Sequence, residues 1–220
     1  MLYRIYGKRL LDLCCAAVGL IVLSPVLLAV AFAVKCGSKG PVLYSQERVG
    51  RASRIFQIWK FRSMISGADK IGPLITASGD SRITGIGRYL RRWKLDELPQ
   101  LWNVLIGDMS FVGPRPELPF YVRDYTPEQR QVFTVRPGIT DPAALEYRHE
   151  EEVLAKAADR ERYYREVVLP HKLALNLEYV QALSLRYDLT LILRTLGAIF
   201  RRSASTTTIS ETPPKTSSLP

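Results

Sequence analysis

The first strong pattern along the chain is an almost unbroken apolar run from Leu10 to Val34, in which Asp12 is the only formal charge. About 20 such residues are enough to cross a bilayer core as a helix. Ser24 and Pro25 interrupt the run, and a proline inside a helix removes one backbone hydrogen bond and clashes with the preceding turn. The pattern therefore predicts two helical limbs joined by a kink, where the Ser24 hydroxyl bonds a carbonyl that the kink frees.

Three arrangements of this apolar segment are open. They are a cleaved signal peptide, a spanning helix, and a re-entrant helix that enters and leaves on the same side of the membrane. The two limbs are roughly 22 Å and 15 Å long at 1.5 Å per residue, so neither alone crosses a core of about 30 Å. Basic side chains flank both ends, namely Arg4, Lys8 and Arg9 before the run and Lys35, Lys39, Arg48, Arg51 and Arg54 after it. Because basic flanks prefer the cytoplasm, charge and kink together favour the re-entrant helix.

Shorter periodic patterns follow the apolar run. Residues 41–44 and 54–62 look like short strands, and in the second of them alternate residues share a face. Residues 66–82 are rich in Gly, Ser and Asp, which predicts a loop. Helical periodicity predicts helices over residues 83–93, 127–135 and 150–185.

The C-terminal region divides into an amphipathic part and a polar part. Residues 187–202 predict a basic amphipathic helix that lies either in a membrane interface plane or in the core. Residues 203–220 are polar and rich in Thr, Ser and Pro, which predicts a disordered tail. We therefore expect a mostly helical α+β fold with amphipathic interfacial helices. Its parts are a re-entrant membrane helix over residues 1–38, a cytosolic catalytic domain over residues 39–202, and the tail.

Charge changes this picture more than any other feature of the composition. The chain has 220 residues, 31 Lys and Arg against 21 Asp and Glu, and a net charge of +10, which favours anionic partners. Nucleic acid is not expected among them, because no binding module with interleaved aromatic and basic residues is present. Neither the cysteines nor the histidines have a metal-site or disulfide spacing: Cys14, Cys15, Cys36, His149 and His171.

A pair of adjacent carboxylates, Asp96 and Glu97, is the first candidate for chemistry. Asp96 resembles a helix N-cap, with Pro99 tolerated in the first turn and Gly107 as the stop. This arrangement would put both carboxylates at the positive end of a helix dipole, which is also an anion site. On these residues alone, an ordinary capping pair is the simpler interpretation.

Basic residues before the carboxylate pair are candidates for phosphate binding. Lys60 and Arg62 alternate along one predicted strand, so they point the same way, roughly 7 Å apart, and can hold a phosphate. A solvated strand edge would explain them equally well. Arg88 and Arg91 or Arg92 are spaced for one face of the following helix, which ends just before the pair.

A further candidate is Arg115, which stands between Pro114 and Pro116. The two prolines fix the backbone around the guanidinium. A rigidly held arginine suits bidentate contact with phosphate, although a plain turn would also explain the sequence.

Taken in order, short motifs from about Lys8 to Arg202 resemble the bacterial sugar transferase family. These are small monotopic phosphoglycosyl transferases that start glycan assembly on a polyprenyl carrier. Each motif is weak alone, and their order and spacing make the resemblance specific. The motifs are KRLLD at 8–12, SP at 24–25, QERVG at 46–50, KFRSM at 60–64, RIT at 82–84, LDELPQL at 95–101, GDMS at 107–110, VGPRP at 112–116 and RPGIT at 136–140.

The resemblance implies a role for each of several residues. Asp96 would be the nucleophile and Glu97 its partner, and the two would hold Mg²⁺ near the diphosphate of a UDP-sugar. Arg91 would contact phosphate, and the loop from Pro114 to Pro116 would contact the nucleotide side. After Thr140 many members continue with Gly, Trp and a Gln-Val motif before an arginine, whereas this chain reads DPAALEYR. Arg148 is then expected in place of that arginine, and the departure leaves the sugar open.

The implied reaction transfers a sugar-1-phosphate. Asp96 would attack the phosphorus that bears the sugar, release UMP and form an aspartyl-phosphosugar, which polyprenyl (undecaprenyl) phosphate would then attack. Mg²⁺ and arginines would neutralise the diphosphate. The expected place is the inner leaflet of the bacterial inner membrane, with the catalytic domain on the cytoplasmic face and a homodimer as a possible assembly.

Other function classes remain open at this level. The nearest is a membrane-bound, metal-dependent phosphohydrolase of nucleotide sugars or lipid phosphates, which would use water in place of lipid. A membrane-tethered nucleic-acid binder is suggested by charge alone. A non-catalytic membrane scaffold would use the carboxylate pair only as a helix cap.

Overall fold

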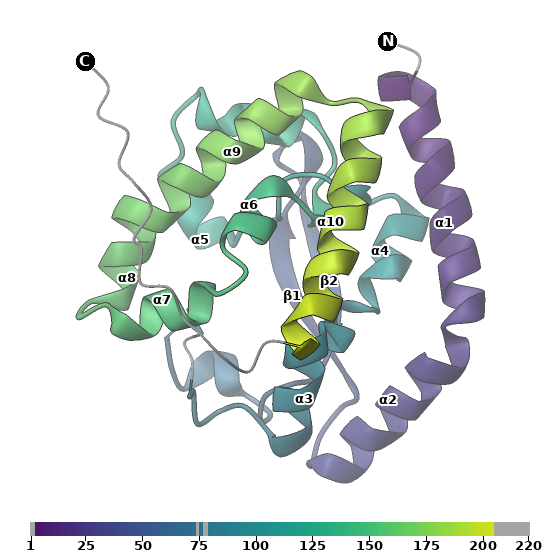
Figure 1. Cartoon of the computed structure of the whole chain (residues 1–220). Coiled ribbons are helices and arrows are strands. Elements are labelled where there is room, and N and C mark those ends of the chain that lie inside the picture. The colour runs from purple at the N-terminus through teal and green to yellow at the C-terminus, as the bar shows by residue number, and fades with distance from the viewer. Residues whose placement is uncertain (1–2, 74, 77–78, 205–220) are drawn as a thin grey trace.

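The structure of the chain is a computed structural model that describes residues 3–73, 75–76 and 79–204. Helices surround two small sheets, with α1 and α2 on one side and α7 to α9 on the opposite side (Figure 1). The predicted mostly helical α+β class is confirmed. The expected tail falls outside the described residues from position 205 on.

The N-terminal apolar segment forms two helices that meet at a kink. A π-helical turn over Tyr3–Gly7 leads into α1 (Lys8–Val22), and α2 (Ser24–Gly37) follows at an angle of 62° (Figure 1). The Ser24 hydroxyl donates to the Ile21 carbonyl oxygen at 2.7 Å, as predicted. Among the described helices none is by itself long and apolar enough to cross a membrane, while this bent pair together might be by length and composition. The kink is confirmed, and the re-entrant arrangement stays a prediction.

Each sheet has two strands. The first pairs β1 (Leu43–Val49) with β2 (Ile55–Phe61) in antiparallel register. The prediction at residues 41–44 therefore reached only the start of β1. The second sheet pairs β3 (Ser110–Val112) with β4 (Gly138–Thr140) in parallel.

Between the two sheets the chain forms a helix, a tight turn and a second helix. Thr84 caps α3 (Gly85–Trp93) by accepting from the Gly87 amide at 2.9 Å. A 3₁₀ turn (Leu95–Glu97) leads into α4 (Gln100–Ile106), which ends at Gly107 with φ 99°.

Asp96 does not cap α4, so the predicted N-cap is wrong. It lies inside the 3₁₀ turn, and Pro99 occupies the N-cap position of α4 without a side-chain hydrogen bond. The physical reason is Lys94, whose left-handed φ of 57° ends α3 and starts the next turn at once. The backbone through Asp96 is therefore already helical, whereas an N-cap residue needs extended dihedral angles.

Charged side chains of α1 fasten the kinked pair to the rest of the molecule. Asp12 is 3% exposed, and its Oδ1 accepts from the Ser110 hydroxyl at 3.0 Å and from the Phe111 amide at 3.1 Å. Arg9 donates to the carbonyl oxygens of Val104 and Leu105, at the C-terminal end of α4. Since a cation at a helix C-terminus is favourable, α1 is held in register with α4 by these contacts.

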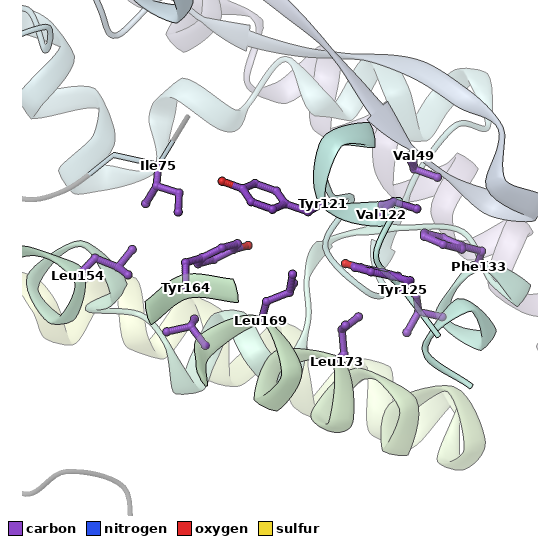
Figure 2. Close-up of a cluster of buried hydrophobic side chains, with 12 residues drawn as sticks. Val49, Ile75, Tyr121, Val122, Tyr125, Phe133, Leu154, Tyr164, Leu169 and Leu173 are labelled. Atoms are coloured by element: carbon purple, nitrogen blue, oxygen red, sulfur yellow. The ribbon is translucent and has the colours of Figure 1, made fainter. Parts of the chain in front are cut away.

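The largest cluster of buried apolar side chains lies behind the loop that carries Arg115. Tyr121, Tyr125, Phe133 and Tyr164 supply its aromatic rings, and in Figure 2 Tyr121, Tyr125 and Phe133 lie on the side opposite Tyr164, Leu169 and Leu173. The contributing elements are α5 (Pro119–Val122), a 3₁₀ helix (Gln129–Thr134), α7 (Glu150–Lys156), a π-helical turn (Tyr164–Val168) and α9 (Leu169–Ala182). The short helices α6 (Pro142–Glu146) and α8 (Arg160–Tyr163) connect them.

The last helix, α10 (Leu185–Ala204), has one buried face and one exposed apolar face. Asp188 and Leu191 are buried, so the predicted core position is confirmed for one face. The opposite side exposes four leucines that are 45–69% accessible: Leu185, Leu189, Leu193 and Leu196. A membrane-interface position for this leucine face stays a prediction.

Candidate active site

Asp96 and Glu97 lie side by side in the turn between α3 and α4, and both are largely withdrawn from solvent. Their exposed fractions are 6% and 8%. The Oδ1 atom of Asp96 is buried and has no hydrogen-bond partner among the described residues. Buried carboxylate oxygens are normally paired, so an oxygen left free here is a mark of a functional group.

The neighbouring Glu97 carboxylate is paired with two cations from distant segments. Its Oε1 accepts from Lys60 Nζ on β2 at 2.9 Å and from Arg115 Nη2, in the loop after β3, at 2.6 Å. Three segments therefore converge on one carboxylate, and two of them bring residues that the sequence had marked as phosphate ligands.

The charges of the two carboxylates differ because their surroundings differ. Burial raises the pKa of the Glu97 carboxyl, but Arg115 and then Lys60 outweigh it and hold this pKa well below its usual range. Burial first, and the Glu97 charge second, raises the pKa of the Asp96 carboxyl. Glu97 therefore carries the more firmly held negative charge, and positive charge brought near Asp96 would lower the pKa of its carboxyl.

The loop around Arg115 is fixed from behind by Arg48 on β1. Arg48 Nη1 donates to the Pro116 carbonyl at 3.2 Å and to Glu117 Oε1 at 3.3 Å, and the Tyr164 hydroxyl donates to Glu117 Oε2 at 2.6 Å. The sequence analysis had identified Arg48 only as a basic residue after the apolar run and as part of the QERVG motif. That motif was the available signal for this positioning role.

Lys60 and Arg62 do not act as one pair, contrary to the prediction. Lys60 contacts Glu97, whereas Arg62 Nη2 donates to the carbonyl oxygens of Val34 and Ser38 at the end of α2. The Arg62 amide still donates to the Val42 carbonyl at 3.0 Å, so the separation comes from the guanidinium, which the C-terminal end of α2 holds.

The arginines that were predicted to share one face of α3 also have different surroundings. Arg88 and Arg92 are exposed, while Arg91 forms an ion pair with Glu151 on α7. Only Nη2 of Arg91 contacts Glu151, so its other N–H groups can still donate to a diphosphate. Arg148 is exposed between α6 and α7 and makes no hydrogen bond within the described part of the chain.

Sequence reasoning missed two buried polar residues of this region. Asp141 is 0% exposed and caps α6 by accepting from the Ala144 amide at 3.0 Å, while its Oδ2 has no partner among the described residues. Burial raises the pKa of Asp141, and Arg115 is the cation that opposes this rise most. The second is Gln100, which is 1% exposed and begins α4. Both stand inside motifs or next to them, but their burial could not be read from the pattern.

The carboxylate pair offers too few oxygen atoms to hold a divalent cation alone, so substrate phosphates and water would have to complete its coordination. No group of three or more His, Cys, Asp or Glu side chains suited to a metal occurs among the described residues. Mg²⁺ is commonly held by one or two carboxylates together with substrate phosphates and water. The unpartnered oxygen of Asp96, with Glu97 adjacent, matches that sparse set.

The arrangement as a whole combines a free carboxylate oxygen with fixed cations. Such a carboxylate can form a covalent bond to an electrophilic phosphorus. Lys60 and Arg115 are placed to stabilise negative charge next to it.

Comparison with known proteins agrees with this chemistry. A family model described as bacterial sugar transferase matches residues 3–202. A protein of Aeromonas hydrophila, named UDP-N-acetylgalactosamine-undecaprenyl-phosphate N-acetylgalactosaminephosphotransferase, is 35% identical over 87% of this chain and 43% of its own length. A protein of Komagataeibacter xylinus, named undecaprenyl-phosphate glucose phosphotransferase, is 39% identical over 90% of this chain and 36% of its own length.

A shorter relative is covered more fully. A protein of Caulobacter vibrioides, named UDP-glucose:undecaprenyl-phosphate glucose-1-phosphate transferase, is 38% identical over 87% of this chain and 69% of its own length. The chain thus spans less than half the length of the first two relatives.

Proposed function

The chain belongs to the bacterial sugar transferase family, and on that premise we propose that it transfers a sugar-1-phosphate from a UDP-sugar to polyprenyl phosphate and releases UMP. The observation that carries the proposal is the Asp96 carboxylate, which no described residue engages, next to a Glu97 carboxylate held by Lys60 and Arg115. The names of the relatives support undecaprenyl phosphate as the acceptor and a nucleotide sugar as the donor.

In the first half-reaction, an Asp96 carboxylate oxygen forms a bond to the phosphorus that bears the sugar. The bond from that phosphorus to the bridging oxygen breaks, and UMP leaves with the electron pair. The enzyme then carries an aspartyl-phosphosugar, a covalent intermediate with a carboxylate nucleophile. Glu97 suits the nucleophile's role less well, because its charge is already engaged by Lys60 and Arg115.

In the second half-reaction, a phosphate oxygen of the polyprenyl phosphate attacks the same phosphorus. The bond to the Asp96 oxygen breaks, the carboxylate is regenerated, and the product is a polyprenyl-diphospho-sugar. Arg115 and Lys60 stabilise the negative charge that develops on the phosphoryl oxygens in both steps. Asp96 and Glu97 would hold Mg²⁺, which when bound supplies charge neutralisation at the diphosphate.

The apolar surface of α1 and α2 supports a membrane location. Ile21, Leu28 and Phe32 are each more than 70% exposed, and such a contiguous apolar face marks a contact with lipid or another partner. The proposed arrangement is a re-entrant helix pair in the inner leaflet, with the rest of the chain on the cytoplasmic face. A homodimer also remains a prediction.

Thiol labelling in intact cells tests this topology. The exposed native cysteines Cys14, Cys15 and Cys36 are first replaced with Ala, and single Tyr6→Cys and Ser45→Cys variants are then made. A re-entrant pair leaves both new thiols protected from an impermeant reagent added outside, and accessible after permeabilisation. Labelling of the Tyr6→Cys variant alone from outside would indicate a spanning helix instead.

UMP release tests the reaction itself. The purified protein in detergent is given a panel of UDP-sugars, with UDP-glucose and UDP-N-acetylgalactosamine first because the relatives carry these names. We expect one UMP per enzyme without lipid, and continuous turnover with glycolipid formation once polyprenyl phosphate is added. A phosphohydrolase would instead turn over without lipid and release free sugar phosphate, which would reject the proposal.

A further inference from the structure

Gln100 is the most poorly satisfied polar side chain next to the carboxylate pair. It is 1% exposed, and neither Oε1 nor Nε2 has a hydrogen-bond partner among the described residues. A buried amide without partners lowers stability, so a group of this kind calls for a functional explanation.

Its place in the chain directs the side chain toward Asp96. Leu98 and Pro99 have helical dihedral angles and connect the 3₁₀ turn to α4, so the backbone from Asp96 to Gln100 is continuously helical. The segment joins a 3₁₀ turn, in which residues three apart share a face, to the first turn of an α-helix, in which residues three or four apart are neighbours, so Gln100 lies about one turn beyond Asp96. Helical side chains also lean toward the N-terminus, which brings Gln100 over the turn that holds Asp96.

The two side chains have complementary unpartnered atoms. Asp96 Oδ1 is a buried acceptor without a donor, and Gln100 Nε2 is a buried donor without an acceptor. No hydrogen bond joins them in this structure, so a side-chain rotation is needed to form one.

We propose that Gln100 is a positioning residue for the nucleophile, and this inference rests on the proposed function. When the donor is bound, Nε2 donates to Asp96 Oδ1, which fixes the carboxylate plane and leaves Oδ2 to form the bond to phosphorus. The hydrogen bond itself consumes no proton. Its effect is to hold the attacking oxygen in line with the departing UMP, where small misplacements are costly.

The same helix offers a matched control. Asn103 is 0% exposed, and its amide is fully used: Oδ1 accepts from the Trp59 amide at 3.0 Å, and Nδ2 donates to the Gln57 carbonyl at 2.7 Å. Asn103 is therefore a buried amide that ties α4 to the backbone of β2. Gln100, three residues earlier, makes no such bond. Removal of the Asn103 amide should therefore lower the stability of the fold, whereas removal of the Gln100 amide should not.

The experiment compares Gln100→Leu, Gln100→Glu and Asn103→Leu with the unmodified chain. We expect Gln100→Leu to melt at or above the temperature of the parent, because an unsatisfied amide is replaced by an apolar group of similar size. Asn103→Leu should melt lower. The single-turnover rate of UMP release should fall about 10²-fold in Gln100→Leu, with the donor KM within about twofold of the parent value.

Gln100→Glu tests the hydrogen bond apart from the size of the side chain, because an ionised carboxylate has the same length as the amide but cannot donate a hydrogen bond. It should also release UMP slowly. A parent rate in Gln100→Leu, or a melting temperature as low as that of Asn103→Leu, would overturn the positioning role. Absence of UMP release from the parent chain would reject the proposed function instead, so the two failures are distinguishable.

Discussion

Replacement of Asp96 by Asn should remove the covalent intermediate and lower UMP release by roughly 10³-fold or more, as expected when a nucleophile is deleted. A neutral amide oxygen is a poor nucleophile, and Glu97 cannot take over because Lys60 and Arg115 hold its carboxylate. Intact-protein mass spectrometry after addition of donor is the direct measurement. The parent chain should gain the mass of one phosphosugar, and the variant none.

The control for this substitution is Asp124→Asn, an exposed carboxylate that pairs with Arg165 on the surface. It should keep both the adduct and the parent rate, because surface ion pairs contribute little. Glycolipid formed by Asp96→Asn at the parent rate, or an adduct that maps to a peptide without residue 96, would contradict the nucleophile assignment.

Replacement of Asp188 by Ala is expected to have the largest effect on stability. Asp188 is 1% exposed, and its Oδ2 accepts from Lys8 Nζ and from the Tyr3 hydroxyl, each at 2.6 Å. Its Oδ1 accepts from the Tyr179 hydroxyl at 2.7 Å. The substitution leaves the Lys8 ammonium in a largely buried place without its counter-charge, which typically costs about 3–5 kcal/mol.

The melting temperature in detergent should fall by roughly 6–20 °C for a chain of this size. The double variant Lys8→Met/Asp188→Leu is the control, since removal of both charges often restores the stability that a single removal takes away. A single variant that melts within 2 °C or so of the parent would mean that α10 is not fastened to α1 through this charge pair.

The carboxylate pair and the cations around Glu97 illustrate what local pattern could and could not predict. Asp96, Glu97, Lys60 and Arg115 were all identified from residue type and motif order, and the structure brings Glu97, Lys60 and Arg115 into contact. The same reasoning failed for Arg62, because the carbonyl oxygens of Val34 and Ser38 at the end of α2 hold its guanidinium. Strand alternation does not contain the position of that helix.

The partners and the burial of polar side chains within helices and strands were the least predictable features. Arg91 is engaged by Glu151, which lies 60 positions further along the chain, and Arg48 supports the Pro116 carbonyl across 68 positions. Gln100 and Asp141 carry no pattern that would announce their burial. Partners at such separations depend on how the helices pack, and no local rule of spacing contains that information.

The sequence by itself determined the kinked apolar segment, the helical class of the fold and the residues with the chemistry for phosphoryl transfer, because periodicity, proline placement and side-chain type are local properties. Only the tertiary structure decided which oxygen of the carboxylate pair is free and which is neutralised. That difference comes from burial and from cations on β2 and on the loop after β3, and a chain acquires both only when distant segments pack together.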